Sequence, residues 1–307
     1  MNQDLLNKLY EMTDQSAVIL SEPMSRHTSF RIGGNADFFL SPRTKEEAVA
    51  VLRLLYQTGE PYYILGNGSN LLVSDNGYRG VVVQLYENLN RIEVKGNQIE
   101  AEAGALLAVI AREAMRSGLS GMEFASGIPG TLGGAIVMNA GAYGGEMKMI
   151  VKEVLLGDLT TGEIIKKTCE EMQFGYRDSL LKHAPYVVLG ATLDLEQGEQ
   201  EAIALRMEEL RIQRVTKQPL EYPSAGSTFK RPEGYFAGKL IDDAGLRGYR
   251  VGGAMVSEKH CGFVVNVDHA SAKDVLTLMK DVRKIVKEQS GVLLEPEVCM
   301  LGENMDL

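Results

Sequence analysis

The stretch Gly127–Gly145, GIPGTLGGAIVMNAGAYGG, holds seven glycines in nineteen residues, and Pro129 lies inside it. Glycine loses more conformational entropy on folding than other residues, so dense glycine marks places where main chain approaches a ligand or another backbone. A flexible linker would be polar and rich in glycine and serine. Here the glycines are interleaved with apolar side chains: Ile128, Leu132, Ile136, Val137 and Met138. We therefore predict a buried loop that lines a ligand.

Composition narrows the class of protein. The chain has 307 residues, 45% of them hydrophobic and 24% charged, which is typical of a globular protein with room for two lobes. No apolar run is long enough to span a membrane, and the N-terminus lacks the layout of a signal peptide. We expect a cytoplasmic protein without membrane insertion. The net charge of −9 argues against nucleic acid as a ligand, and an anionic substrate would need a local basic site.

Cysteine and histidine usage gives no sign of a metal. The 3 cysteines are widely spaced and form no Cys-x-x-Cys pair, and the 4 histidines show no His-x-x-x-His spacing. Neither a disulfide framework nor a metal site is predicted.

The pattern of apolar residues and turn signals predicts alternating helices and strands. Expected helices cover residues 1–20, 45–58, 106–116, 198–216, 236–244 and 271–291, with one more opened by Thr168 and Glu171. Expected strands cover residues 36–40, 61–65, 81–85, 92–94, 99–101, 186–195, 254–256, 261–267 and 292–301, with a second hairpin around residues 160–162. This mixture favours an α+β fold with much antiparallel sheet over a doubly wound parallel one.

Pro219 and Pro223 follow a charged helix and mark a boundary in the chain. We predict a lobe over residues 1–197, a connecting helix over 198–216 and a C-terminal domain over 217–307.

A second glycine segment follows an expected strand: Gly66, Asn67, Gly68, Ser69 and Asn70, with Leu71 after it. A dinucleotide fingerprint would need glycine at position 71, and a Walker A loop before Gly238 would need glycine at position 233, where glutamate stands. Both motifs therefore fail. The segment can be a nest of backbone amides for phosphate oxygens or a simple β-turn.

Three polar residues stand where chemistry could occur. Arg177 lies among aromatic residues, Ser227 lies in a glycine-centred loop, and Glu297 interrupts an apolar strand. Each also has a structural explanation, namely a surface ion pair of Arg177 with Asp178 or Glu171, a turn serine, and an exposed strand edge.

A basic cluster near the boundary could hold a diphosphate or a carboxylate. It comprises Arg206, Arg211, Arg214, Lys217, Lys230, Arg231 and Lys239. The alternative is a solvated helix face, because glutamates alternate with the arginines. Lys217 and Lys230 escape that explanation and are the better candidates.

The motifs together resemble the UDP-N-acetylenolpyruvoylglucosamine reductase (MurB) family over nearly the whole chain. The resemblance rests on residues 31–37, 66–70, 127–131, 139–144, 176–179, 225–230 and 295–298, in this order and spacing. It implies an FAD-binding lobe of the vanillyl-alcohol-oxidase-like (PCMH) type, with its core over about residues 33–197, and a smaller α/β substrate-binding lobe. It also implies non-covalent FAD, NADPH as reductant and a UDP-sugar substrate, which is reduced to UDP-N-acetylmuramate for peptidoglycan synthesis. The oligomeric state stays open, with a monomer favoured.

The resemblance also implies roles for particular residues. Arg177 would bind the substrate carboxylate, Ser227 would donate the proton, and Glu297 would stabilise the intermediate or supply the proton. Cofactor contacts would come from Gly66, Asn67, Gly68, Ser69, Asn70, Leu71, Gly127, Ile128, Pro129, Gly130, Thr131, Asn139, Ala140 and Gly141. Substrate contacts would come from Lys217, Lys230, Arg231 and His260.

The chain resembles the shorter, second branch of the family, because it has no room between Arg177 and Lys217 for the lid insertion of the other branch. Arg231 replaces an asparagine of that branch and His260 replaces a glutamine. Two other functions stay open: a flavin oxidase of the same fold, and a non-enzymatic nucleotide-sugar binding protein that would not need Ser227 or Glu297.

Overall fold

The computed structural model describes residues 3–307. The chain forms two compact units. The first unit comprises the residues up to Leu20, Phe38–Asn67 and Gly80–Arg214, and the second comprises Ser21–Asp37, Gly68–Arg79 and Val215–Leu307. Each unit has a hydrophobic core of its own. The predicted domain boundaries at residues 197 and 217 stay a prediction.

The structure contains short 3-10 turns besides its regular helices and strands. The α-helices are α1 (Gln3–Met12), α2 (Lys45–Thr58), α3 (Leu107–Arg116), α4 (Leu132–Val137), α5 (Gln200–Lys217), α6 (Ala237–Asp243) and α7 (Ala272–Ser290). The strands up to residue 146 are β1 (Val18–Pro23), β2 (Asn35–Leu40), β3 (Tyr62–Leu65), β4 (Leu71–Val73), β5 (Tyr78–Gln84), β6 (Ile92–Lys95), β7 (Gln98–Glu102), β8 (Leu119–Ser120), β9 (Gly141–Ala142) and β10 (Gly145–Glu146). The later strands are β11 (Val151–Asp158), β12 (Ile164–Thr168), β13 (Tyr186–Asp194), β14 (Glu196–Gln197), β15 (Ser224–Ser227), β16 (Arg250–Val251), β17 (Ala254–Val256), β18 (Phe263–Asn266) and β19 (Cys299–Leu301).

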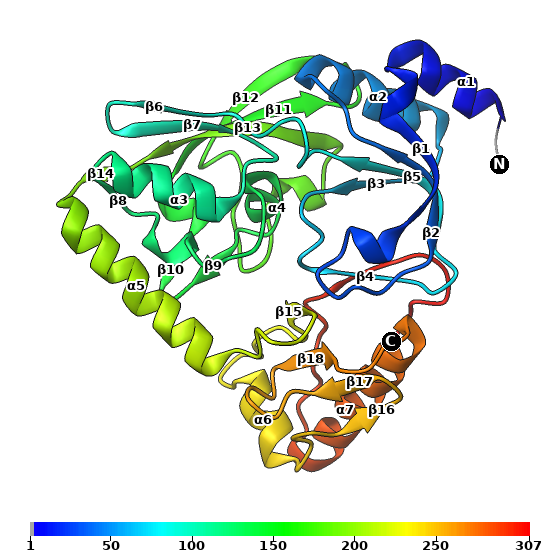
Figure 1. Ribbon diagram of the computed structural model, residues 1–307, viewed down its shortest axis with the longest axis vertical. Helices are drawn as coiled ribbons and strands as arrows, with labels where there is room; N and C mark the ends of the chain where they lie inside the picture. Colours follow the sequence, from blue (N-terminus) through cyan, green and yellow to red (C-terminus); the bar gives the residue numbers. More distant parts are fainter. Residues whose placement is uncertain (1–2) are drawn as a thin grey trace. The chain divides into compact units, whose positions relative to one another are not determined.

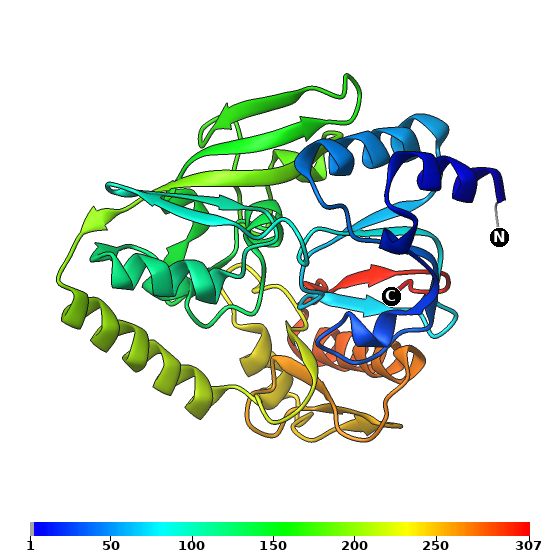
Figure 2. The same cartoon turned by 45° about the horizontal axis from the view of Figure 1, so that its top comes forward.

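A five-stranded antiparallel sheet dominates the first unit, in the order β12-β11-β13-β7-β6. The central strand β13 is apolar and buried from Val187 to Leu193, because side chains pack on both of its faces. Helices α3 and α4 cover one face of this sheet (Figure 1), and Figure 2 shows the β11–β12 hairpin extending at the far edge. Both predicted hairpins are confirmed.

Local signals set the ends of α2 in the first unit. The Thr44 side chain accepts a hydrogen bond from the backbone N–H of Glu47, and Gly59 ends the helix in a left-handed conformation with φ of 69°. The helix is followed by β3, which pairs in parallel with β5. The predicted order of strand, helix and strand is therefore confirmed here.

The second unit contains the four-stranded sheet β15-β18-β17-β16, and α7 packs along β16 and β17 (Figure 1). Ser271 and Asp274 form a capping box at the start of α7, and Gly291 ends the helix, close to the predicted bounds of 271 and 291. Asp75 also accepts hydrogen bonds from the backbone N–H groups of Ala272 and Lys273, at 2.8 and 3.0 Å. The N-terminus of α7 is thus fixed by three carboxylate or hydroxyl side chains.

The structure corrects three expected elements. The helix predicted for residues 1–20 ends at Met12, because β1 begins at Val18. Thr168 and Glu171 do exchange capping hydrogen bonds, but no helix follows, since Gln173 takes a φ of 51° and turns the chain away. The strand expected over residues 292–301 is regular only from Cys299 to Leu301, with one isolated bridge at Pro296.

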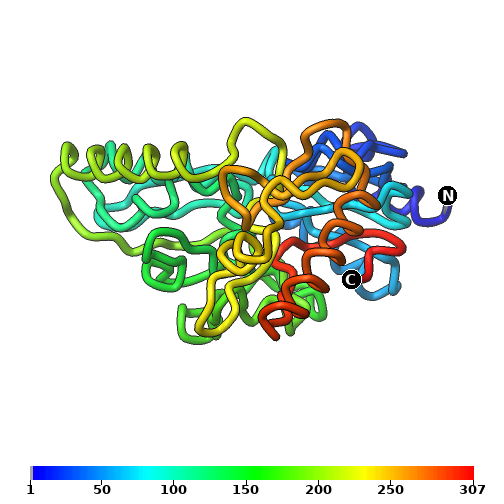
Figure 3. The backbone as a smooth tube through the Cα atoms, turned by 90° about the horizontal axis from the view of Figure 1, so that it is seen from below, coloured from blue at the N-terminus to red at the C-terminus, as the bar shows by residue number. Residues whose placement is uncertain are grey.

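Helix α5, which is about as long as α7, is uninterrupted along its length (Figure 3). Within residues 3–307, no helix is both long and apolar enough to cross a membrane.

Candidate active site

Two glycine segments of the first unit lie against each other. A Cβ placed at Gly66 would come within 2.4 Å of Thr131 Oγ1, so only glycine fits there. The Asn67 side chain donates a hydrogen bond to the Pro129 carbonyl, with a distance of 2.7 Å between Nδ2 and O. Thr131 in turn caps α4 by accepting from the backbone N–H of Gly134 at 3.4 Å. The predicted segments at 66–67 and 127–131 therefore form one structure.

Backbone amides of these segments are available to a ligand. Within the described residues, the N–H groups of Asn67, Gly127, Gly130 and Thr131 have no hydrogen-bond acceptor. Thr131 is buried, and the other three residues are partly buried. Because partly buried N–H groups normally find partners, a set of unpaired ones fits an anion such as a phosphate.

The remaining cofactor candidates of the first unit are supported by apolar packing. The partly buried Ile128 and Ala140 pack against the hydrophobic core. Gly141 belongs to β9, which pairs with β10 across a tight turn at Tyr143 and Gly144, both with positive φ. The main chain of this segment is fixed by contacts within the unit.

In the second unit, the glycine segment continues from Gly68 into β4. Gly68 has a φ of 60°, and a Cβ there would come within 1.9 Å of the His27 carbonyl oxygen, so a side chain is excluded. Ser69 is partly buried, and Leu71 is a core residue. The Asn70 side chain donates to the Glu297 carbonyl, with Nδ2 and O 3.1 Å apart. Asn70 therefore helps to position the segment that carries Glu297.

Ser227 and Glu297 lie on paired stretches of backbone in the second unit. The Glu297 N–H donates to the Thr228 carbonyl at 2.9 Å, and the Lys230 N–H donates to the Glu295 carbonyl at 2.8 Å. A bulge at Gly226, with a φ of 76°, interrupts the pairing of β15 with β18 and leaves Ser227 exposed. The structure thus pairs the backbone segments that carry two of the three predicted catalytic residues.

Arg177 lies at the tip of a two-residue turn in the first unit. Gly175 and Asp178 pair across this turn, and the Arg177 guanidinium lies 5.1 Å from the centre of the Tyr176 ring. Of the two surface residues considered from the sequence, Asp178 forms an ion pair with His183 at 3.1 Å, and Glu171 forms one with Lys167 at 3.8 Å.

Asn139 supports this turn from inside the first unit. Its side chain is 1% exposed, and Nδ2 donates to the Gly175 carbonyl at 3.0 Å and to Glu146 Oε2 at 3.1 Å. Its Oδ1 accepts from the Lys148 N–H at 3.0 Å, and its φ of 42° is a conformation that asparagine tolerates. Asn139 therefore connects the glycine-rich segment with the turn that carries Arg177.

The substrate-contact candidates of the second unit differ in their surroundings. Lys230 Nζ forms an ion pair with Glu295 at 3.1 Å, and the Arg231 guanidinium stacks 3.9 Å from the centre of the Phe236 ring. Lys217 is exposed at the end of α5. Lys217 and Arg231 are exposed and accessible to an anionic ligand, whereas Lys230 is partly buried and paired.

His260 is held in one neutral form. Its Nδ1 accepts a hydrogen bond from the Gly262 N–H at 3.0 Å, so the ring proton belongs on Nε2. Burial lowers the pKa of His260 below its ordinary value. Nε2 has no partner among the described residues, so it can donate to a ligand.

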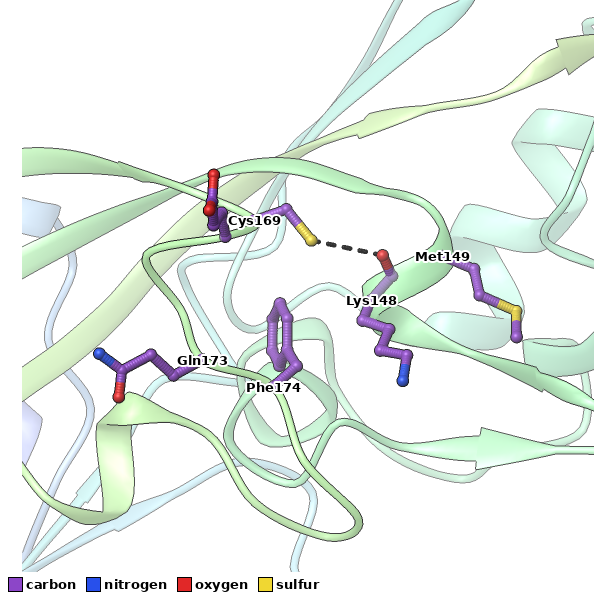
Figure 4. Close-up of a pocket in the computed structure, with 6 residues that line it drawn as sticks. Lys148, Met149, Cys169, Gln173 and Phe174 are labelled. Carbon is purple, nitrogen blue, oxygen red and sulfur yellow. Dashed lines mark hydrogen bonds between the residues drawn. The ribbon is translucent and has the colours of Figure 1, made fainter.

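A pocket of about 390 Å³ in the first unit is lined by residues 148, 149, 169, 170, 173 and 174, and none of these is a predicted site residue (Figure 4). The Phe174 ring and the Cys169 thiol point into the same space, and Sγ lies 3.3 Å from the Lys148 carbonyl. Burial raises the pKa of the Cys169 thiol, which disfavours a reactive thiolate.

Arg214 differs from the other arginines of α5, a difference that the prediction did not include. We grouped it with a charged helix face, although Arg214 has Leu210, Arg211, Lys217 and Gln218 as its helical neighbours three and four residues away. None of these is acidic, so the spacing alone already distinguishes Arg214 from the other arginines of α5.

A model of an FAD binding domain matches residues 36–168, so the chain is an FAD-binding protein, and the unpaired amides of its glycine segments fit the phosphates of that cofactor. A second model, described as UDP-N-acetylenolpyruvoylglucosamine reductase, C-terminal domain, matches residues 218–301. The chain belongs to the UDP-N-acetylenolpyruvoylglucosamine reductase family. The α+β fold class and the family resemblance predicted from the sequence are confirmed.

Curated relatives with that name cover the chain almost completely. The relative from Clostridioides difficile (strain 630) is 51% identical over 99% of this chain and 99% of its own length. The relative from Caldanaerobacter subterraneus subsp. tengcongensis is 53% identical over 99% of this chain and 100% of its own length. The crystal structure of UDP-N-acetylenolpyruvylglucosamine reductase (MurB) from Thermus caldophilus has a TM-score of 0.79 and 38% identity, and the match covers 93% of this chain and 98% of that chain.

Asn139→Ala should lower the free energy of unfolding by about 2 kcal/mol, because it removes three hydrogen bonds of a buried side chain and leaves buried partners unpaired. Urea unfolding monitored by circular dichroism measures the change. Asn90→Ala is the control, since Asn90 is exposed and bonds only to its own turn. Equal stability of the two variants would contradict the supporting role of Asn139.

His260→Gln should flatten the dependence of Tm on pH between about 7.5 and 5.5. The unfolded chain takes up a proton at His260 near pH 6.5, whereas the folded chain resists it because the folded-state pKa is lowered. The contribution is therefore complete above that pH and is lost as pH falls. Differential scanning fluorimetry over this range tests the prediction, and a variant whose Tm falls as steeply as that of the wild type would refute it.

Proposed function

We propose that the chain reduces UDP-N-acetylenolpyruvoylglucosamine to UDP-N-acetylmuramate in peptidoglycan precursor synthesis, with NADPH as reductant. Its family membership supports this reaction, and the observation that carries the residue assignment is the pairing of the Ser227 and Glu297 segments. When bound, FAD supplies the hydride that adds to the enolpyruvyl methylene carbon. The chain itself must then bind the substrate carboxylate, stabilise the developing negative charge and deliver a proton.

We assign the carboxylate to Arg177. A guanidinium binds a carboxylate through two parallel hydrogen bonds, which withdraws charge from the adjoining double bond. The turn at Gly175 and Asp178 holds the Arg177 backbone at a φ of 55°, and Asn139 anchors the turn. The side chain thus starts from a fixed backbone, as a binding group requires.

We assign proton delivery to Ser227, assisted by Glu297. A serine hydroxyl is a weak acid, so it needs a neighbour that replaces the proton. Lys230 is close to Ser227 in sequence, but its Nζ forms an ion pair with Glu295 at 3.1 Å. Glu297 is the better candidate, because its N–H binds the carbonyl of the residue next to Ser227.

Ser227→Ala should leave the reduction of bound FAD by NADPH intact and slow the reoxidation of the flavin by the enolpyruvyl sugar by at least about 100-fold, because only the second half-reaction needs the proton. Anaerobic stopped-flow absorbance of the flavin separates the two half-reactions. Ser224→Ala, in the same strand, is the matched control and should leave both intact. An equal loss of both half-reactions would contradict the role.

Lys217→Ala should raise KM for the UDP-sugar roughly 10-fold and leave kcat nearly unchanged, since a diphosphate contact far from the reacting carbon contributes uniform binding. Steady-state kinetics at saturating NADPH measure both constants. Lys239→Ala is the control, because the Lys239 ammonium is exposed and pairs with Asp243 at 2.9 Å. A KM equal to that of the wild type would remove Lys217 from the site.

The finer expectations on partners are proposals as well. We expect the UDP-sugar and NADPH as ligands, Arg231 and His260 among the substrate contacts, and a cytoplasmic monomer that binds no nucleic acid. The accessible cation of Arg231 and the Nε2 donor of His260 support these contacts.

A further inference from the structure

The arginines of α5 fall into two groups in the structure. Arg206 Nη1 pairs with Glu209 at 2.9 Å, and Arg211 Nε pairs with Glu208 at 2.6 Å. The Arg214 guanidinium forms no hydrogen bond or ion pair with any residue of the described chain. One arginine of this helix therefore retains an uncompensated charge.

Arg214 is also the least solvated of the three arginines of α5. Its side chain is partly buried against the glycine loop of the first unit, where a Cβ placed at Gly127 would lie 3.0 Å from Arg214 Cδ and 3.6 Å from Nη1. Burial lowers the pKa of Arg214, with the neighbouring Tyr143 acting in the opposite direction. An arginine stays protonated under physiological conditions, so this cation loses hydration without gaining a partner from the described residues.

The surroundings of Arg214 supply the rest of an anion site. The N–H groups of Gly127, Gly130 and Thr131 lack acceptors in the described chain, and so does that of Asn67, whose side chain binds the Pro129 carbonyl. Backbone amides orient phosphate oxygens but carry no net charge. A diphosphate diester is a dianion, and a guanidinium is the cation that binds its oxygens in pairs.

We propose that Arg214 is the counter-cation of the diphosphate that the glycine loop binds, and that this diphosphate is the one of FAD. The inference rests on the proposed function, in which the protein binds two ligands that carry a diphosphate, FAD and the UDP-sugar. FAD is the better match in the first unit, since the residues that meet Arg214 belong to the segment that an FAD binding domain model covers.

The test compares flavins with and without phosphate. Full-length protein freed of flavin is titrated with FAD and with riboflavin, followed by quenching of flavin fluorescence. Arg214→Gln should weaken FAD binding about 10- to 100-fold and leave riboflavin binding within about twofold, as expected for the loss of one charged hydrogen-bonding partner. Arg214→Lys should recover part of the loss. Arg211→Gln, which removes an arginine already paired with Glu208, should bind FAD as the wild type does.

Three results would overturn the inference. Arg214→Gln could bind FAD as tightly as Arg211→Gln, or it could weaken riboflavin and FAD equally, which would indicate a packing defect. It could also weaken binding of UDP to the flavin-loaded protein while FAD affinity is unchanged, which would assign Arg214 to the substrate. A wild-type protein that takes up no FAD would refute the proposed function itself, and the inference with it.

Discussion

Backbone contacts that exclude side chains set the framework of the candidate site. Gly66 lies so close to Thr131, and Gly68 so close to the His27 carbonyl, that a Cβ at either position would overlap an oxygen atom. Each close approach occupies the space that a side chain would need. Several N–H groups of the two glycine segments have no acceptor among the described residues, and such groups can bind a phosphate.

In the second unit, the register of backbone hydrogen bonds positions the segments that carry Ser227 and Glu297. The Glu297 N–H binds the Thr228 carbonyl, and Phe229 and Pro296 form a bridge beside it. A shift of this register by one residue would change which residues of the two segments lie opposite each other. Asn70 adds a second constraint through its bond to the Glu297 carbonyl. The positions of Ser227 and Glu297 thus depend on hydrogen bonds made by neighbours.

The sequence predicted those helices whose ends are set by residues within one turn. The caps at Thr44 and Gly59 and the capping box at Ser271 depend on residues within one turn, and the helices expected over residues 45–58 and 271–291 form with nearly these bounds. The helix expected after Thr168 does not form, although its capping bonds do, because Gln173 adopts a φ of 51° and turns the chain away. The candidate site likewise has parts that local sequence predicts and parts that depend on contacts between distant segments. Glycine motifs marked the loops, whereas contacts such as those of Gly66 with Thr131 join distant segments and needed the structure.

The charges of the chain show how an acidic protein can hold an anion. A net charge of −9 repels a diphosphate at long range, but salt screens this repulsion beyond about 10 Å. Close to the site, Glu208 and Glu209 are occupied by Arg211 and Arg206, so these carboxylates oppose the ligand less than their formal charges suggest. Near the glycine loop, the described residues leave a set of oriented amides and the Arg214 guanidinium without partners. Affinity for the anion then depends on local geometry, and the overall charge of the protein can vary with little consequence for it.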